Sequence, residues 1–179
     1  MCRSDLSAKS ALIDYHQNPP ASPGLVKSTT MSKSLLNPDT PIKVSSTLDK
    51  SVAKKHLVDN SPETCWTSQQ GLPQYVQLAF SEPVIPETLH LTFQGGFVGT
   101  RCAVKVPAPT EGSDKSWQTL LLIFPGDINS RQEFSLKTDS TAAVVAGGID
   151  RLRLEFEESS DFFGRITLYD LKLYGETVG

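Results

Sequence analysis

The sequence predicts an all-β protein, an antiparallel jelly-roll sandwich of about eight strands. Several segments alternate apolar and polar residues with the period of a strand that buries one face. Clusters of glycine and proline separate these segments, as turns do. Strands do not alternate with long helical patterns, so the sequence gives no indication of a parallel sheet.

Four segments show the clearest strand pattern: residues 75–80, 89–93, 152–156 and 166–174. In the first of these, Val76, Leu78 and Phe80 share one face. In the last, the alternation changes phase near Tyr169 and Asp170, which predicts a β-bulge. Weaker patterns predict further strands at residues 42–47, 101–106, 120–124 and 133–136, and residues 51–58 form the one short helical candidate.

Residues 1–40 differ in composition from the rest of the chain. They are rich in Ser, Thr and Pro, and their apolar residues occur in isolated pairs such as Leu35 and Leu36. A segment with so little apolar surface cannot offset its loss of chain entropy. We therefore expect a disordered tail over residues 1–40 and one sandwich domain over residues 41–177.

Composition and charge exclude several classes of protein. The longest apolar run, Leu120 to Phe124, is far shorter than the roughly 20 residues that cross a bilayer. A net charge of -3 argues against direct binding to nucleic acid. Three cysteines without paired spacing exclude a disulfide scaffold and a zinc finger. No secretory signal begins the sequence, so we expect thiols in a reducing compartment.

Motifs for catalysis are missing from the sequence, which has no nucleophile elbow, P-loop or metalloprotease motif. Cys65 with His56 would be a nucleophile and its base, but a cysteine beside the apolar Trp66 is more often a small buried side chain. His90 alternates with Leu89 and Leu91, which predicts an exposed histidine on a strand. We predict a protein that is not an enzyme.

The segment from Asp59 to Trp66 has two interpretations. Asp59 and Thr64 supply a carboxylate and a hydroxyl of the kind that bind Ca²⁺. Alternatively, Asp59 or Asn60 closes a turn through side-chain to backbone hydrogen bonds, after which Trp66 enters the core. The second is the more common use of such residues.

Two glycine-containing loops carry aromatic residues. Residues 94–101 hold three glycines around Phe97 and Val98, which would form an exposed contact surface at a loop tip unless Phe97 folds back into the core. Residues 161–165 form a loop of the same character. Arg165 in that loop pairs with an anionic group of a partner, or with Asp161 or Glu158 of its own chain.

These stretches resemble the discoidin (coagulation factor V/VIII type C) fold. The opening of that fold resembles residues 59–66 together with 74–78, and its last strand resembles residues 165–175. The segments Phe93-Gln94-Gly95-Gly96-Phe97 and Asp161-Phe162-Phe163-Gly164-Arg165 are similar to those of a family of small nuclear-receptor-associated proteins. Secreted discoidin domains carry a disulfide that joins the two ends of the domain, and this sequence has no cysteines at those places, which places it with intracellular members.

The resemblance implies a monomer of the nucleus and also of the cytoplasm that binds the orphan nuclear receptor called testicular receptor 4. It implies repression of the receptor by reduced binding to DNA response elements, with no enzymatic activity, membrane binding or direct nucleic-acid binding. The residues that it implies for the partner contact are Gln94, Phe97, Val98, Arg101, Phe162, Phe163 and Arg165.

Two other functions stay open from the sequence. One is a calcium-assisted module for a glycan or small polar ligand, in which Asp170 of the last strand joins Asp59 and Thr64; no other cofactor is expected. The other is a discoidin-like subunit of an intracellular complex, such as a ubiquitin ligase or a ciliary transport assembly.

Overall fold

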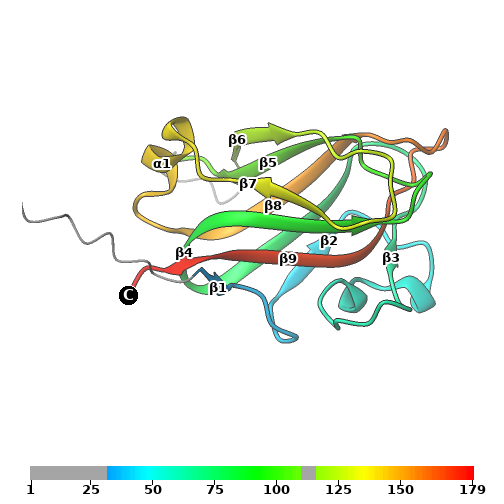
Figure 1. The fold of residues 1–179 in the computed structure, drawn as a ribbon, viewed down its shortest axis with the longest axis horizontal. Coiled ribbons are helices and arrows are strands. Elements are labelled where there is room, and N and C mark those ends of the chain that lie inside the picture. The colour runs from blue at the N-terminus through cyan, green and yellow to red at the C-terminus, as the bar shows by residue number, and fades with distance from the viewer. Residues whose placement is uncertain (1–31, 110–115) are drawn as a thin grey trace, which may run out of the picture.

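The computed structural model describes residues 32–109 and 116–179, which form an antiparallel β-sandwich of two packed layers (Figure 1). Its strands are β1 (Lys33–Ser34), β2 (Ile42–Val44), β3 (Trp66–Thr67), β4 (Gln74–Phe93), β5 (Arg101–Pro107), β6 (Trp117–Ile123), β7 (Gln132–Ser135), β8 (Ile149–Glu158) and β9 (Thr167–Thr177). The predicted all-β, antiparallel class is confirmed. Every strand pairing is antiparallel, and the main path of the sheet runs β1-β9-β4-β8-β5-β6.

Strand β4 joins the two layers because it is 20 residues long and changes its partners midway. Residues 74–79 pair with β8, and residues 84–93 pair with β9. The sequence divides this strand in two because Pro83 and Pro86 indicate turns. In the structure these prolines lie where the register shifts, so the chain bends without leaving the sheet.

The predicted bulge in the last strand is confirmed. Thr92 pairs with Asp170 and Phe93 pairs with Leu168, which leaves Tyr169 as the extra residue on β9.

The core lies between the layers and takes alternate residues of each strand. On β8, for example, Leu152, Leu154 and Phe156 are completely buried while the residues between them face outward. Phe156 meets Phe93 of β4 edge to face, with ring centroids 5.9 Å apart. The largest fully buried side chains include Trp66, Phe93, Phe156, Leu57, Leu78, Leu89, Leu91, Leu136, Leu152, Leu154, Ile166 and Leu168.

Residues 33–36, just before the predicted domain boundary at residue 41, are part of the sandwich. Strand β1 pairs with β9, and the backbone N–H of Leu35 donates to the carbonyl of Leu173 at 2.8 Å. Leu35 and Leu36 pack against the core. An isolated apolar pair that packs at a sheet edge shows no strand period in the sequence, so it resembles a residue pair of a disordered tail. The rest of the predicted tail, residues 1–31, lies outside the described residues.

The helical prediction was right in place but wrong in type and incomplete. Residues 51–58 form two 3₁₀ turns, η1 (Lys50–Val52) and η2 (Lys54–Leu57). A short α-helix, α1 (Asp139–Val145), was missed. Thr138 caps it, since its hydroxyl accepts from the N–H of Thr141 while the Thr141 hydroxyl accepts from the N–H of Thr138. In the described part of the chain, no helix has the length and apolar character needed to span a membrane.

Candidate functional site

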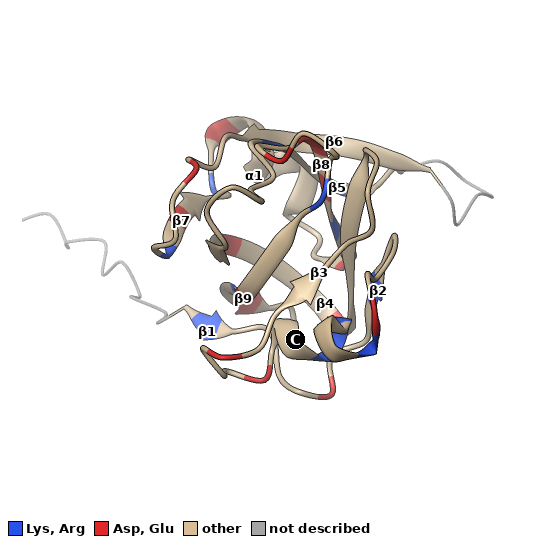
Figure 2. Ribbon diagram, turned by 90° about the vertical axis from the view of Figure 1, so that its right-hand side faces the viewer, with Lys and Arg blue, Asp and Glu red and all other residues tan. Residues whose placement is uncertain are grey.

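The end of the sandwich opposite the C-terminus is built from loops (Figure 1). We call it the loop end and define it as residues 45–48, 68–73, 94–100, 124–131 and 159–166. Backbone N–H groups of Gly95 and Gly96 donate to the side chains of Asn129 and Asp127, at 2.7 and 2.6 Å. Figure 2 views the molecule from this end and shows positions of both charge signs interspersed around it.

The loop between β8 and β9 is tied to two of its neighbours. The N–H of Val98 donates to the hydroxyl of Ser160 at 2.9 Å, and the N–H of Gly71 donates to the carbonyl of Phe163 at 2.8 Å. Backbone groups that are held in this way lose little further freedom on binding. The loop end is therefore a preorganised surface.

Asp161 organises the β8–β9 loop from within. Its Oδ2 accepts from the N–H groups of Phe163 and Arg165 and from Arg165 Nε, while Oδ1 accepts from Arg165 Nη2 at 2.9 Å. The hydrogen bond from Arg165 lowers the pKa of Asp161 below its usual value. Gly164 completes the turn with a φ of +76°, and a Cβ there would lie 3.0 Å from Leu72 Cγ.

This loop presents two aromatic side chains to solvent. Phe162 is 95% exposed and Phe163 is 56% exposed, and their rings meet edge to face with centroids 5.3 Å apart. Behind them, the guanidinium of Arg165 lies 4.9 Å from the centroid of Phe97 and 5.5 Å from that of Phe163. The contacts of Arg165 with the two rings and its ion pair with Asp161 hold the β8–β9 loop in one conformation.

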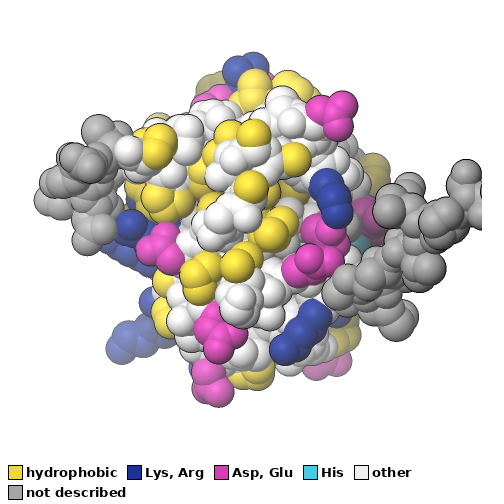
Figure 3. Space-filling model, turned by 90° about the vertical axis from the view of Figure 1, so that its left-hand side faces the viewer, with side chains coloured by type: hydrophobic (Ala, Val, Ile, Leu, Met, Phe, Trp, Pro, Cys, Tyr) yellow, Lys and Arg dark blue, Asp and Glu magenta, His cyan; other side chains and the backbone are white. Residues whose placement is uncertain are grey.

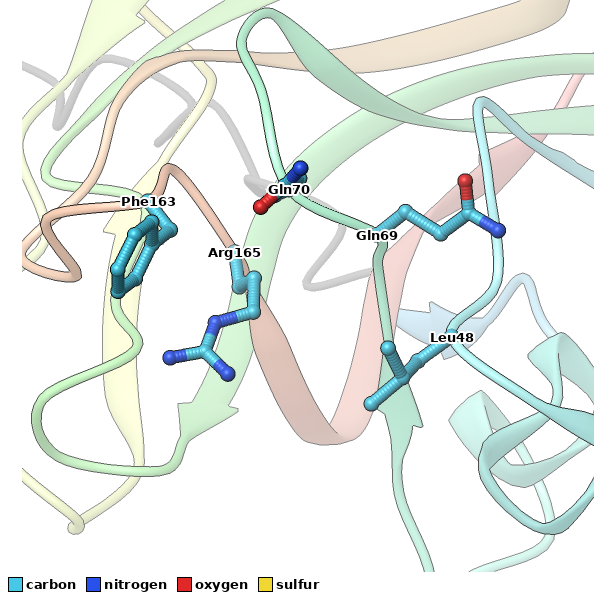
Figure 4. A pocket seen from close by; sticks show the side chains of 5 residues that line it. All are labelled: Leu48, Gln69, Gln70, Phe163 and Arg165. Atoms are coloured by element: carbon cyan, nitrogen blue, oxygen red, sulfur yellow. The ribbon is translucent and has the colours of Figure 1, made fainter.

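A shallow hollow of about 420 Å³ lies beside Phe163 and is lined by Leu48, Gln69, Gln70, Phe163 and Arg165 (Figure 4). Phe163 and Arg165 come from the β8–β9 loop, and the other three residues come from the segments on either side of β3. Leu48 in the lining and Leu72, which lies close to Gly164, are both exposed. The hollow therefore combines apolar walls with amide and guanidinium donors.

Of the predicted contact residues, Phe162 and Phe163 are exposed as expected. Arg165 takes the second of its two predicted roles, pairing with Asp161. Arg101 donates to Glu157 at 2.7 Å.

Gln94 and Phe97 are half-buried. Phe97 is thus neither fully exposed at the loop tip nor fully folded back into the core. The surface position expected for Val98 is wrong, because this residue is completely buried. The turn at Gly96, closed by the N–H of Phe97 donating to the carbonyl of Gln94, sends the chain back inward.

Four exposed apolar residues of the loop end were missed: Leu48, Leu72, Phe124 and Ile128. Leu48, Leu72 and Ile128 are each a single apolar residue among turn formers. Phe124 ends the apolar run that begins at Leu120 and is directly followed by Pro125 and Gly126. An apolar residue placed next to turn residues is the signal that could have identified them.

The proposed calcium ligands are only partly assembled. Burial acts to raise the pKa of Asp59, but hydrogen bonds involving His56, Ser61 and Thr64 outweigh it and lower that pKa. Asp59 Oδ1 accepts a hydrogen bond from the backbone N–H of Ser61 at 3.0 Å, so Asp59 closes the turn, as the alternative interpretation expects. Asp170 lies on β9, and its Oδ2 is 3.7 Å from Lys172 Nζ. Within residues 32–109 and 116–179, no group of three or more His, Cys, Asp or Glu side chains could hold a metal ion. Calcium binding stays a prediction.

The histidines and cysteines do not form a nucleophile and base in the described residues. His56 Nδ1 lies 2.8 Å from Asp59 Oδ2, while Cys65 Sγ lies 3.7 Å from Thr67 Oγ1. Burial raises the pKa of the other described thiol, Cys102, which disfavours the reactive thiolate. His90 is largely buried between Tyr174 and Glu133, so its predicted exposure is wrong.

Acidification is expected to release the β8–β9 loop. Because the pKa of Asp161 is lowered in the folded protein, its contribution to stability is complete above the usual aspartate pKa of about 3.9 and is lost as the pH falls below that value. An NMR titration of the Asp161 carboxyl and the Phe163 amide measures this. A midpoint at or above the usual value would contradict the role given to Arg165.

Known proteins resemble this chain along most of its length. The nuclear receptor 2C2-associated protein of Mus musculus is 38% identical over 152 residues, which cover 83% of this chain and 100% of the mouse protein. The proteins of the same name from Homo sapiens and Danio rerio are 37% and 38% identical over 151 residues. No family model matches the sequence.

Solved structures share the fold at low sequence identity. A family 32 carbohydrate-binding module from Clostridium perfringens, solved with galactose, superposes with a TM-score of 0.62 at 12% identity and covers 80% of this chain and 99% of its own. An F5/8 type C domain from Bacteroides fragilis also has a TM-score of 0.62 at 12% identity, with 82% and 98% covered. By fold the chain is thus a discoidin-like jelly roll, and by sequence it belongs to the family of the nuclear receptor 2C2-associated proteins.

Proposed function

We propose that this chain is a non-enzymatic module that binds a nuclear receptor through its loop end and represses it by reducing its binding to DNA response elements. The receptor that we assign is the orphan receptor testicular receptor 4. The protein acts in the nucleus and is also present in the cytoplasm. The observation that carries the proposal is the pair of exposed phenylalanines on a preorganised loop of a protein whose relatives are named for association with a receptor.

The chemistry of the loop end suits protein recognition. Phe162 and Phe163 are anchors of the kind that dominate binding energy when they enter a partner's pocket. The hydrogen bonds of Asp161 hold them in place before binding, which lowers the entropy cost of association. Leu48, Leu72 and Phe124 extend the apolar surface around them.

Charge supports occlusion of the receptor's DNA-binding region. A surface that binds DNA is basic, since it must neutralise phosphates. This chain has a net charge of -3, which favours approach to such a surface and disfavours binding to DNA itself. The chain therefore competes with DNA for the receptor without contacting DNA.

An electrophoretic mobility assay with purified receptor and a labelled response element tests this function. Adding the chain is expected to lower the fraction of retarded DNA, and the chain alone is expected to leave the DNA mobility unchanged. A retarded fraction that stays constant at saturating chain would contradict repression by occlusion. A further retarded complex of all three components would show association without occlusion.

A further inference from the structure

Strand β6 (Trp117–Ile123) is the outermost strand on its side of the sheet. In the described part of the chain it pairs with β5 alone. In an antiparallel pair, the N–H and C=O groups of alternate residues point away from the partner strand. The outer edge of β6 therefore offers a row of backbone donors and acceptors to another strand.

Proteins usually protect such edges, and the other peripheral strands of this sheet are protected. They are two to four residues long, and three of them carry a charged side chain: Lys33 on β1, Lys43 on β2 and Glu133 on β7. Short length and charge both discourage pairing between edges. These four strands are therefore protected from pairing with another chain by their short length and, in three of them, by charge.

Strand β6 lacks both protections. It is seven residues long, and the run from Trp117 to Phe124 contains no charged residue, proline or glycine. A register shift of the β5–β6 ladder, opposite Val104 and Lys105, is its one irregularity. Along the strand Thr119 is exposed, Leu122 is 38% exposed, and Phe124 just beyond it is 63% exposed.

We propose that two copies of this chain associate through their β6 strands, antiparallel and edge to edge, and so continue one sheet across the dimer. In a two-fold symmetric dimer the same strand of each copy forms the contact, so the side chains of β6 must be compatible with those of a second β6. Like charges that face one another across such a pair are destabilising. An uncharged strand such as β6 avoids this conflict, so a second copy of β6 can pair with it without such repulsion.

The dimer contact does not need Phe162 and Phe163, which lie in the β8–β9 loop, and the positions that test it, Thr119 and Leu122, lie outside the loop end. The dimer replaces the monomer that the sequence resemblance implies. Failure of the dimer would leave the proposed function unchanged, and failure of receptor binding would leave the dimer unchanged.

Sedimentation equilibrium of the full chain over a wide concentration range tests the proposal. The wild type is expected to approach twice the 19.5 kDa of one chain. The variants Thr119→Lys and Leu122→Lys place a charge on the free edge and are expected to weaken association about tenfold or more. Both positions are exposed at the surface, so the fold should persist, and a circular dichroism melt checks this.

Ser135→Lys is the matched control, because it places the same charge on an exposed residue of the protected strand β7. It is expected to associate like the wild type. A wild-type mass of one chain at every concentration would overturn the proposal. Unchanged association of both folded lysine variants would overturn it as well, since the contact would then lie elsewhere.

Discussion

The double variant Phe162→Ala/Phe163→Ala is expected to bind the receptor about a thousandfold more weakly than the wild type, because aromatic anchors at the centre of an interface contribute roughly 2 kcal/mol or more each. Stability should change by less than about 1 kcal/mol, since Phe162 is 95% exposed and both rings lie outside the core. Titration calorimetry with purified receptor and a urea unfolding curve measure the two quantities.

Val144→Ala provides the control for this variant. Val144 is an exposed apolar residue of α1, at the other end of the sandwich. Figure 3 views that end and shows apolar side chains between charged ones of both signs. This variant should bind like the wild type. If the double variant bound the receptor with the same affinity as the wild type, the assignment of the loop end as the receptor interface would be contradicted.

Trp66→Ala is expected to lower the free energy of unfolding by about 3–5 kcal/mol, as large aromatic truncations in a core do. The Trp66 side chain is completely buried, and its Nε1–H donates to the carbonyl of Ser46 at 3.0 Å. The change would therefore leave both a cavity and a carbonyl without its donor.

Trp66→Phe separates these two contributions, because phenylalanine restores most of the packing and leaves out the hydrogen bond. It is expected to lose about 1–3 kcal/mol. Urea unfolding followed by circular dichroism gives both values. A loss below 1 kcal/mol for Trp66→Ala would show that the core does not depend on this side chain.

The strands were predictable because each buries one face. Leu152, Leu154 and Phe156 alternate with charged residues in the sequence and alternate between core and surface in the structure. The bulge at Tyr169 was visible as a change of phase. The sequence did not reveal that residues 74–93 form one strand. Proline usually interrupts a central strand, but it is tolerated where the register of the strand pairing shifts, as it does around Pro83.

The candidate site was predictable only where the local sequence determines exposure. Phe162 and Phe163 lie within a turn that Asp161 and Gly164 form from residues close in sequence. The burial of Val98 depends on how its loop packs against Ser160, 62 residues away in sequence. Contacts of that range leave no periodic signal in a single sequence.

The most direct test of the central claim is hydrogen exchange of the chain with and without bound receptor. We predict slower exchange of backbone amides in residues 94–100 and 159–166 on binding. We predict no change in strand β1 and helix α1, which lie at the other end of the sandwich (Figure 1). Protection confined to β1 and α1, with the two loops unchanged, would contradict receptor binding through the loop end.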